Sequence, residues 1–137
     1  MLNHKRIFLT GGAGFIGSTL IGELVERNRI FVYDNFSRDS LAQRQYGKHK
    51  NLVRIEGDVL DAGHLAQAMA SANPHLVVHL AAIVGEPACA IDEQQARAIN
   101  LGGTLNALEA AQHDLCWEKE SQQLIRLYQD ILVPSRP

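Results

Sequence analysis

Three glycines near the start of the chain have a spacing that suits the binding of a phosphate group. Gly11, Gly14 and Gly17 fall in the segment TGGAGFIG, between a short apolar run and an amphipathic stretch. In such a loop the first glycine permits a tight turn, the second admits a pyrophosphate, and the third allows close helix packing. Backbone N–H groups at the helix start, at Phe15 and Ile16, then hold the phosphates. This pattern predicts a dinucleotide site rather than a purely structural turn.

Asp34 follows the second apolar run, IFVY, and is the residue that we expect to bind a ribose. It lies about 20 residues after the glycine loop, as expected for a ribose-binding acid. A carboxylate there accepts hydrogen bonds from both ribose hydroxyls and repels a 2′-phosphate, so NAD is favoured over NADP. The alternative is a solvated turn residue. Arg38 either offsets part of that repulsion or is a surface charge, and we favour the surface charge.

These residues need a scaffold that brings the ends of several strands together. Apolar runs typical of buried strands cover residues 6–10, 30–33, 52–55 and 76–80. Helical patterns cover residues 15–27 and 65–72 and a third stretch that begins at the cap Asp92 and ends near Gln112. We expect Asn28 to end the first helix in the left-handed conformation.

Each strand is apolar nearly throughout, and strands alternate with helices, which favours a parallel sheet covered on both faces. Right-handed crossovers then predict an α/β fold: a partial Rossmann fold of about four strands in the order 3-2-1-4, plus a C-terminal helix.

The composition is that of a cytoplasmic, single-domain protein. The 137 residues have 46% hydrophobic side chains and a net charge of −2, which offers no bulk attraction to nucleic acid or to acidic membranes. Cys89 and Cys116 fit a reducing compartment, and we find no export signal and no apolar run of about 20 residues. We divide the chain into an NAD-binding domain, residues 1–112, and a helical tail of unclear origin, residues 113–137.

Together these features resemble the extended short-chain dehydrogenase/reductase family, the NAD-dependent epimerases and dehydratases that act on nucleotide sugars. The resemblance covers about residues 5–112 and includes TGGAGFIG, YDNFS at 33–37, GDV at 57–59, HLAA at 79–82 and INLGGT at 99–104. It implies that NAD is the cofactor. The cofactor-binding residues are then Gly11, Gly14, Phe15, Ile16, Gly17, Asp34, Asn35, Asp58, Val59, Leu80, Ala81, Ala82 and Asn100.

The resemblance also implies separate roles for these residues. Asp58 faces the adenine amino group and Val59 the adenine ring, unless Asp58 only caps a turn. The end of the fourth strand lies along the ribose and the pyrophosphate. Asn100 supports the active site or, in the alternative, satisfies backbone groups. We expect His79 to be a packed core histidine.

The groups that carry out the reaction in this family lie beyond the resemblance. The family has a Ser or Thr on a fifth strand and a Tyr-x-x-x-Lys pair, in which the tyrosinate exchanges a proton with the sugar hydroxyl. Tyr46 and Lys50 fit the letters but fall in a polar stretch between the second and third strands, so we interpret the match as coincidence. We therefore assign no catalytic residue and no metal ligand, and we expect the isolated chain to be inactive.

The tail does not resemble the family. CWEKESQQLIRLYQDIL at 116–132 loosely resembles the last helix of nucleotide-sugar glycosyltransferases with two Rossmann domains, or it is an ordinary amphipathic helix. Without a fifth strand the fourth strand is an open edge, so we expect the tail to cover it or two chains to pair there as a homodimer.

Three functions remain, in this order. The first is the NAD(H)-binding portion of a nucleotide-sugar epimerase or dehydratase. The second is an active enzyme whose missing groups come from another chain, or whose chemistry uses residues that we do not recognise. We expect a nucleotide-sugar site only if another chain completes this one. The third is a non-enzymatic NAD-sensing or interaction module.

Overall fold

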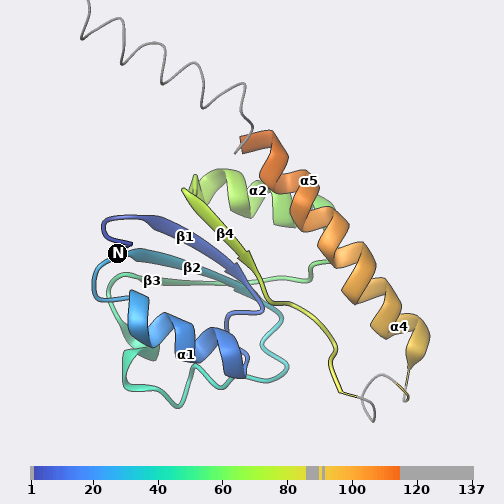
Figure 1. Ribbon diagram of the computed structural model, residues 1–137, viewed down its shortest axis with the longest axis horizontal. Coiled ribbons are helices and arrows are strands. Elements are labelled where there is room, and N and C mark those ends of the chain that lie inside the picture. The colour runs from blue at the N-terminus through green and yellow to red at the C-terminus, as the bar shows by residue number, and fades with distance from the viewer. Residues whose placement is uncertain (1, 86–89, 91, 115–137) are drawn as a thin grey trace, which may run out of the picture.

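The computed structural model describes residues 2–85, 90 and 92–114. Its four strands are β1 (Arg6–Thr10), β2 (Arg29–Asp34), β3 (Leu52–Glu56) and β4 (Leu76–His79). They form one sheet in the order β3-β2-β1-β4, and every neighbouring pair is parallel (Figure 1). The partial Rossmann fold and the strand order predicted from the sequence are therefore confirmed.

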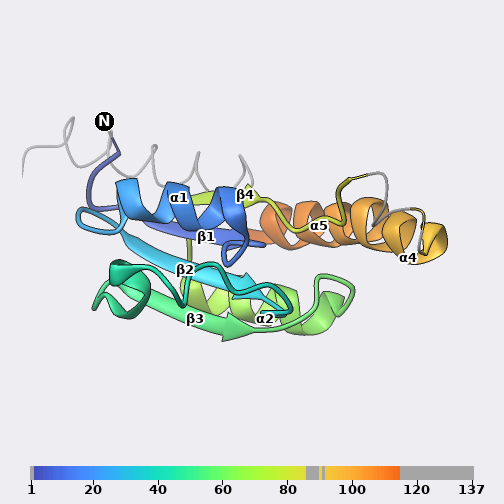
Figure 2. The same ribbon diagram turned by 90° about the horizontal axis from the view of Figure 1, so that it is seen from below.

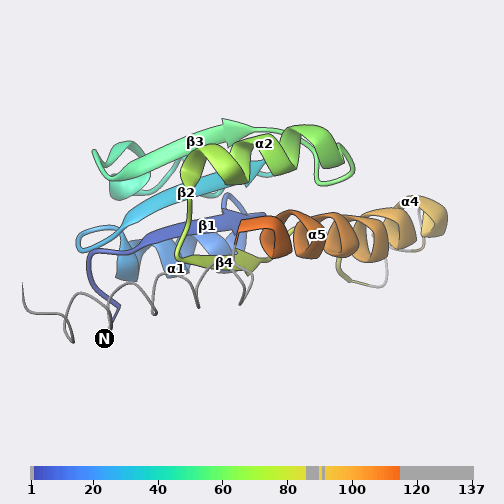
Figure 3. The ribbon, with the colours of Figure 1, turned by 90° about the horizontal axis from the view of Figure 1, so that it is seen from above.

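Helices cover both faces of the sheet. Helix α1 (Phe15–Leu24) lies on one face, and α2 (Ala62–Ala72) and α5 (Thr104–Asp114) lie on the other (Figures 2 and 3). Successive side chains of a strand point to opposite faces, so Ile7 and Leu9 of β1 pack beside α1 whereas Phe8 packs beside α2. All three are fully buried, which explains why the strand is apolar along its whole length.

The polar stretch after β2 is anchored to the rest of the fold. It contains a short 3-10 helix, Gln45–Lys48, and Leu41 is fully buried in the core beside α1. The N–H of Ser40 donates to the carbonyl of Ala13 at 2.9 Å. Asp39 forms an ion pair with Arg54 of β3. The loop therefore returns to the glycine loop and stays close to the sheet.

The third helical stretch is not a regular α-helix. It consists of α4 (Glu93–Arg97), a π-helical segment (Ala98–Gly103) and α5, and the π-helical turn was not predicted. The predicted cap is confirmed, because the Asp92 side chain accepts from the N–H of Gln95 at 2.8 Å. A Cβ added at Gly103 would lie 2.6 Å from Val59, and Asn106 donates to the Val59 carbonyl at 2.9 Å. The helix thus packs closely against the loop after β3.

The predicted end of α1 is wrong. The helix ends at Leu24 rather than Arg27, and Asn28 does not have the left-handed conformation. Its buried side chain instead donates to the carbonyl of Leu24 at 3.0 Å and accepts from the N–H of Lys5 at 3.0 Å. Asn73, after α2, is the asparagine that ends a helix in the left-handed conformation.

The predictions for Cys89, for Cys116 and for the tail helix at 116–132 concern residues that lie outside the described part of the chain. Within the described part, none of the helices has the length and apolar character needed to span a membrane.

Candidate functional site

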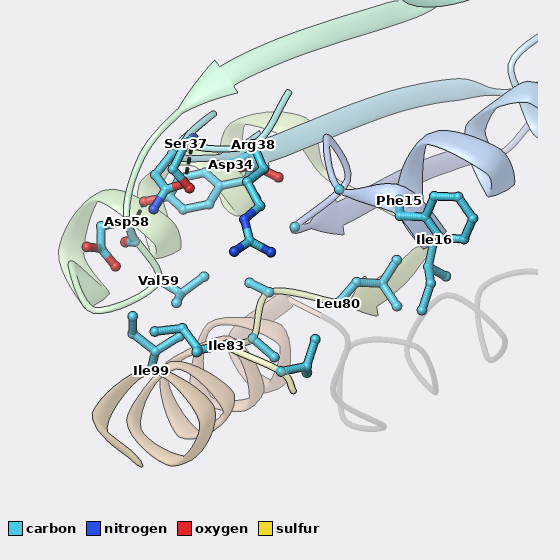
Figure 4. A pocket seen from close by; sticks show the side chains of 18 of the residues that line it. Phe15, Ile16, Asp34, Ser37, Arg38, Asp58, Val59, Leu80, Ile83 and Ile99 are labelled. Atoms are coloured by element: carbon cyan, nitrogen blue, oxygen red, sulfur yellow. Dashed lines mark hydrogen bonds between the residues drawn. The ribbon is translucent and has the colours of Figure 1, made fainter. Parts of the chain in front are cut away.

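A cavity of about 430 Å³ opens where the four strands end (Figure 4). Ligands of open α/β sheets bind at this edge. Twelve of the thirteen predicted site residues line the cavity: Gly11, Gly14, Phe15, Ile16, Gly17, Asp34, Asn35, Asp58, Val59, Leu80, Ala81 and Ala82. Eight further residues line the cavity that were not among the predicted site residues, and of these only Arg38 was considered from the sequence; they are Tyr33, Ser37, Arg38, Ser40, Gly57, Ile83, Val84 and Ile99.

The glycine loop has the tight geometry that its sequence predicts. Gly11 has a φ of +67°, and a Cβ added to it would lie 2.5 Å from the backbone N of Ala81. A Cβ on Gly17 would lie 2.6 Å from the Cα of Gly12. The loop therefore touches the end of β4 on one side and the start of α1 on the other, with no room for side chains.

The start of α1 is open to an anion. Gly14 is the N-cap residue, no side chain caps the helix, and its first turn has no acidic residue. The side chains of Phe15 and Ile16 are 77% and 67% exposed at the rim of the cavity. Because the positive end of the helix dipole and the first backbone N–H groups lie here, a phosphate is the ligand that this end suits best.

Asp34 connects the glycine loop to the turn after β2. Its Oδ2 accepts from the N–H of Ala13 at 2.9 Å, and its Oδ1 accepts from the N–H of Phe36 at 2.9 Å. The side chain is half-buried and lines the cavity. A carboxylate has about four lone-pair sites, so two remain for a ligand.

Arg38 extends its guanidinium into the cavity on the side of Asp34 (Figure 4). The side chain is exposed, and within residues 2–85, 90 and 92–114 it has no hydrogen-bond or ion-pair partner. This position supports the ligand-facing alternative over a purely surface charge.

Tyr33, near the end of β2, and Asp58, just after β3, form one wall of the cavity. The Tyr33 hydroxyl donates to the carbonyl of Asp58 at 3.0 Å. Burial, together with the nearby carboxylates of Asp61 and Asp58, raises the pKa of Tyr33 to about 12, so this tyrosine stays protonated at neutral pH. Asp58 Oδ1 accepts from the N–H of Leu60 at 2.9 Å, which is the turn-capping role left open above. Its other carboxylate oxygen has no partner among the described residues.

Asn100 does not line the cavity. Its Oδ1 accepts from the N–H of Ile83 at 2.8 Å, and its Nδ2 donates to the Ile83 carbonyl at 2.8 Å. The side chain therefore satisfies backbone groups, and it acts on the cavity by holding Ile83, which lines it.

His79 is half-buried rather than packed in the core. Its Nδ1 lies 2.6 Å from Thr10 Oγ1 and its Nε2 lies 3.2 Å from Thr104 Oγ1. Burial lowers the pKa of this histidine below its ordinary value.

Tyr46 lies away from the cavity. Its hydroxyl donates to the carbonyl of Ser18 at 2.6 Å, and its ring packs over Gly22. This placement supports the interpretation that the Tyr46–Lys50 match is coincidence.

Comparison with known proteins agrees with this geometry. The model of the NAD dependent epimerase/dehydratase family matches residues 7–128, a range that extends past Gln112, where we expected the resemblance to end. The dTDP-L-rhamnose 4-epimerase of Burkholderia thailandensis is 30% identical over 113 residues, which cover 80% of this chain and 31% of the relative. The UDP-N-acetyl-alpha-D-glucosaminuronate decarboxylase of Bacillus cytotoxicus is 37% identical over 111 residues, 78% of this chain and 33% of the relative.

The chain spans about a third of the length of these curated relatives. Among solved structures, the enzyme WbmG of Bordetella bronchiseptica in complex with NAD and UDP has 36% identity and a TM-score of 0.70, over 82% of this chain and 35% of that one. Sequence, fold and site together show that the chain belongs to the NAD dependent epimerase/dehydratase family.

Proposed function

We propose that this chain binds NAD(H) in the cavity at the strand ends, as the dinucleotide-binding portion of a nucleotide-sugar epimerase or dehydratase. One observation carries the proposal: the glycine loop, the uncapped start of α1 and Asp34 all meet at one cavity. NAD, when bound, supplies a hydride acceptor and donor.

The glycine loop and α1 would hold the pyrophosphate. The N–H groups of Phe15 and Ile16 lie at the positive end of α1, and no acidic side chain in the first turn opposes an anion. Arg38 adds a positive charge inside the cavity (Figure 4). Leu80, Ala81 and Ala82 would form the facing wall along the ribose and pyrophosphate.

The adenosine end would lie between the turns after β2 and β3. Asp34 would accept hydrogen bonds from the ribose hydroxyls at its two remaining lone-pair sites, and Asn35 lies beside it. Val59, held by Asn106, would pack against adenine, and the unpartnered oxygen of Asp58 would accept from its amino group. The carboxylate of Asp34 favours NAD over NADP by repelling a 2′-phosphate.

The described residues lack a tyrosine suited to act as the base. Tyr33 is protonated and donates to Asp58, and Tyr46 donates to Ser18 away from the cavity. A base must lie within hydrogen-bond reach of the sugar hydroxyl and titrate near the working pH. We therefore propose that residues 2–85, 90 and 92–114 bind the cofactor and that the base lies outside these residues. If the enzyme is completed by another chain, that chain supplies the base.

Calorimetry with an Asp34→Ala variant tests this proposal. A hydrogen bond to a charged group contributes about 1.5–3 kcal/mol, so we expect NAD affinity to fall about tenfold or more and the preference over NADP to narrow. Glu23→Ala is the matched control, because Glu23 is exposed on α1 and does not line the cavity. A folded native chain that binds no NAD would overturn the proposal.

We also propose that two copies associate through the side formed by β4 and α5. β4 is an edge of the sheet. Leu101, Leu105 and Leu108 are 53%, 55% and 54% exposed, at a spacing that places them on one helix face. Sedimentation should show a dimer that Leu105→Glu converts to a monomer. A native monomer, or a dimer that this variant leaves intact, contradicts the proposal.

A further inference from the structure

His79 joins three segments of the chain behind the cavity. Its Nδ1 lies 2.6 Å from the hydroxyl of Thr10, the last residue of β1. Its Nε2 lies 3.2 Å from the hydroxyl of Thr104, the first residue of α5. The Thr104 hydroxyl also lies 2.6 Å from the carbonyl of Asn100, one turn earlier. A single imidazole thus connects β1, β4 and the helix that follows.

For a neutral imidazole, the chemistry of the partners fixes the direction of each of these hydrogen bonds. A carbonyl only accepts, so the Thr104 hydroxyl gives its one hydrogen to Asn100. Thr104 Oγ1 must then accept from His79, which places a hydrogen on Nε2. In a neutral imidazole the other nitrogen is an acceptor, so Nδ1 receives the hydrogen of Thr10. Of the two neutral tautomers, only the Nε2–H form satisfies all three bonds as they stand.

This arrangement affects the part of the cavity wall that is formed by Leu80 and Ala81, next to Thr10. Because the Thr10 hydrogen points to His79, the lone pairs of its oxygen are free for the N–H of Ala81 at 3.4 Å. They also accept a longer contact, at 3.3 Å, from the N–H of Leu80, which donates to the Thr10 carbonyl at 2.9 Å. Ala81 is also the residue whose backbone N leaves no space for a Cβ on Gly11. The glycine loop and the end of β4 therefore keep a spacing that the Thr10 hydroxyl helps to set.

The other end of the chain of bonds holds the far side of the same segment. Asn100, whose carbonyl receives the Thr104 hydrogen, clamps the backbone of Ile83 with both polar atoms of its side chain. The segment between His79 and Ile83 is thus bonded at one end to Thr104, the first residue of α5, and at the other to Asn100 in the π-helical turn, a type of turn found frequently at functional sites. Three members of that segment, Leu80, Ala81 and Ala82, line the cavity.

We propose that His79 is a positioning residue for the dinucleotide, which holds the Thr10 and Thr104 hydroxyls and so fixes the gap between the glycine loop and residues 80–83. The inference rests on the proposed binding of NAD. His79 itself does not line the cavity, so it acts through Thr10 and the backbone of residues 80–81.

The tautomer can be measured on the native chain without NAD. Nitrogen-15 NMR of the imidazole should show His79 as the Nε2–H form alone at neutral pH, with its signal assigned from its loss in His79→Gln. A mixture of both tautomers, as in a solvated histidine, would contradict the hydrogen-bond chain.

Substitutions then test whether this chain of bonds positions the cofactor. His79→Asn places an acceptor near the Nδ1 position and keeps the bond from Thr10, whereas His79→Gln places a donor near Nε2 and leaves Thr10 without its acceptor. We expect NAD affinity to fall about tenfold in His79→Gln and in Thr10→Val, and clearly less in His79→Asn. Equal losses in the Asn and Gln variants would indicate a packing role and overturn the inference.

Thr104 has a matched control in Thr19. Each hydroxyl donates to a carbonyl four residues earlier, Asn100 for Thr104 and Phe15 for Thr19, but only Thr104 contacts a histidine. Thr104→Val should weaken NAD binding severalfold and allow the second tautomer of His79, whereas Thr19→Val should leave the tautomer unchanged. No change in either variant would overturn the inference. A native chain that shows the single tautomer but binds no NAD would refute the proposed function and leave the hydrogen-bond chain standing.

Discussion

Asp34 Oδ2 accepts a hydrogen bond from the backbone N–H of Ala13 at 2.9 Å, which bonds the end of β2 to the glycine loop. The residue predicted to bind a ribose is thus also part of the structure that shapes the phosphate site. Its second oxygen holds the turn at Phe36, which has the left-handed conformation. A change at Asp34 therefore affects the loop and the ligand together.

We expect Asp34→Ala to destabilise the fold as well as weaken NAD binding. The variant leaves the N–H groups of Ala13 and Phe36 without their acceptors, which should lower the free energy of unfolding by about 1–3 kcal/mol. Urea denaturation without ligand measures this loss. If the variant unfolds at the same urea midpoint as the native chain, these two bonds do not stabilise the loop.

Gly11→Ala should be more destabilising than Gly85→Ala. Both glycines have positive φ, +67° and +95°, but a Cβ at Gly11 meets backbone, whereas no atom of the described residues lies within 4 Å of a Cβ at Gly85. Left-handed strain alone costs about 1–2 kcal/mol, and a clash with a packed backbone adds about 1–3 kcal/mol. Thermal or urea unfolding of the two variants separates the cost of the left-handed conformation from the cost of the clash. Equal losses would contradict the close approach of Gly11 to Ala81.

Arg38→Ala should weaken the binding of both dinucleotides, NADP more than NAD. Its guanidinium lies inside the cavity and attracts phosphate, and the effect should shrink at high salt. Arg44→Ala removes the same charge from an exposed position outside the cavity and serves as the control. Calorimetry at two salt concentrations gives the comparison. Equal effects of the two variants would indicate that Arg38 is only a surface charge and does not contact the ligand.

Stability should fall as the pH drops below about 6.5, the ordinary pKa of histidine, through His79. Burial lowers the pKa of His79 in the folded state, so the unfolded chain binds the proton first. Stability from the neutral imidazole is therefore complete above the unfolded pKa and is lost as the pH falls through the folded one. Among the described residues, the polar groups within hydrogen-bond distance of the ring are the hydroxyls of Thr10 and Thr104, and neither of them is charged.

The difference in free energy of unfolding between the native chain and His79→Gln isolates this effect from the other histidines. It should shrink as the pH falls from about 7 to 5, the range in which histidine titrates. A difference that stays constant over this range would contradict the shifted pKa.

Much of the fold could be predicted because its signals are local. The apolar runs, the glycine loop and the acid Asp34 each follow from a few neighbouring residues, and right-handed crossovers then determine the strand order. The cap at Asp92 was predicted for the same reason, since it depends on a contact three residues away.

The features that sequence reasoning missed depend on contacts between distant residues. His79 bonds to Thr10 across the sheet, and the loop carrying Arg38 returns to the cavity because Leu41 is buried beneath it. The end of α1 was misplaced because the side chain of Asn28, rather than its backbone conformation, caps the carbonyl of Leu24. The one available signal for the loop was Leu41, the only large aliphatic residue in the mostly polar stretch 35–51.

The most direct test of NAD binding at the strand ends is a titration of the nitrogen-15-labelled native chain with NAD, followed by NMR at each backbone N–H. We predict the largest shifts at Gly14, Phe15, Ile16 and Gly17, with further shifts at Asn35 and Val59. Shifts confined to other parts of the fold, or none at saturating NAD in a folded sample, would contradict it.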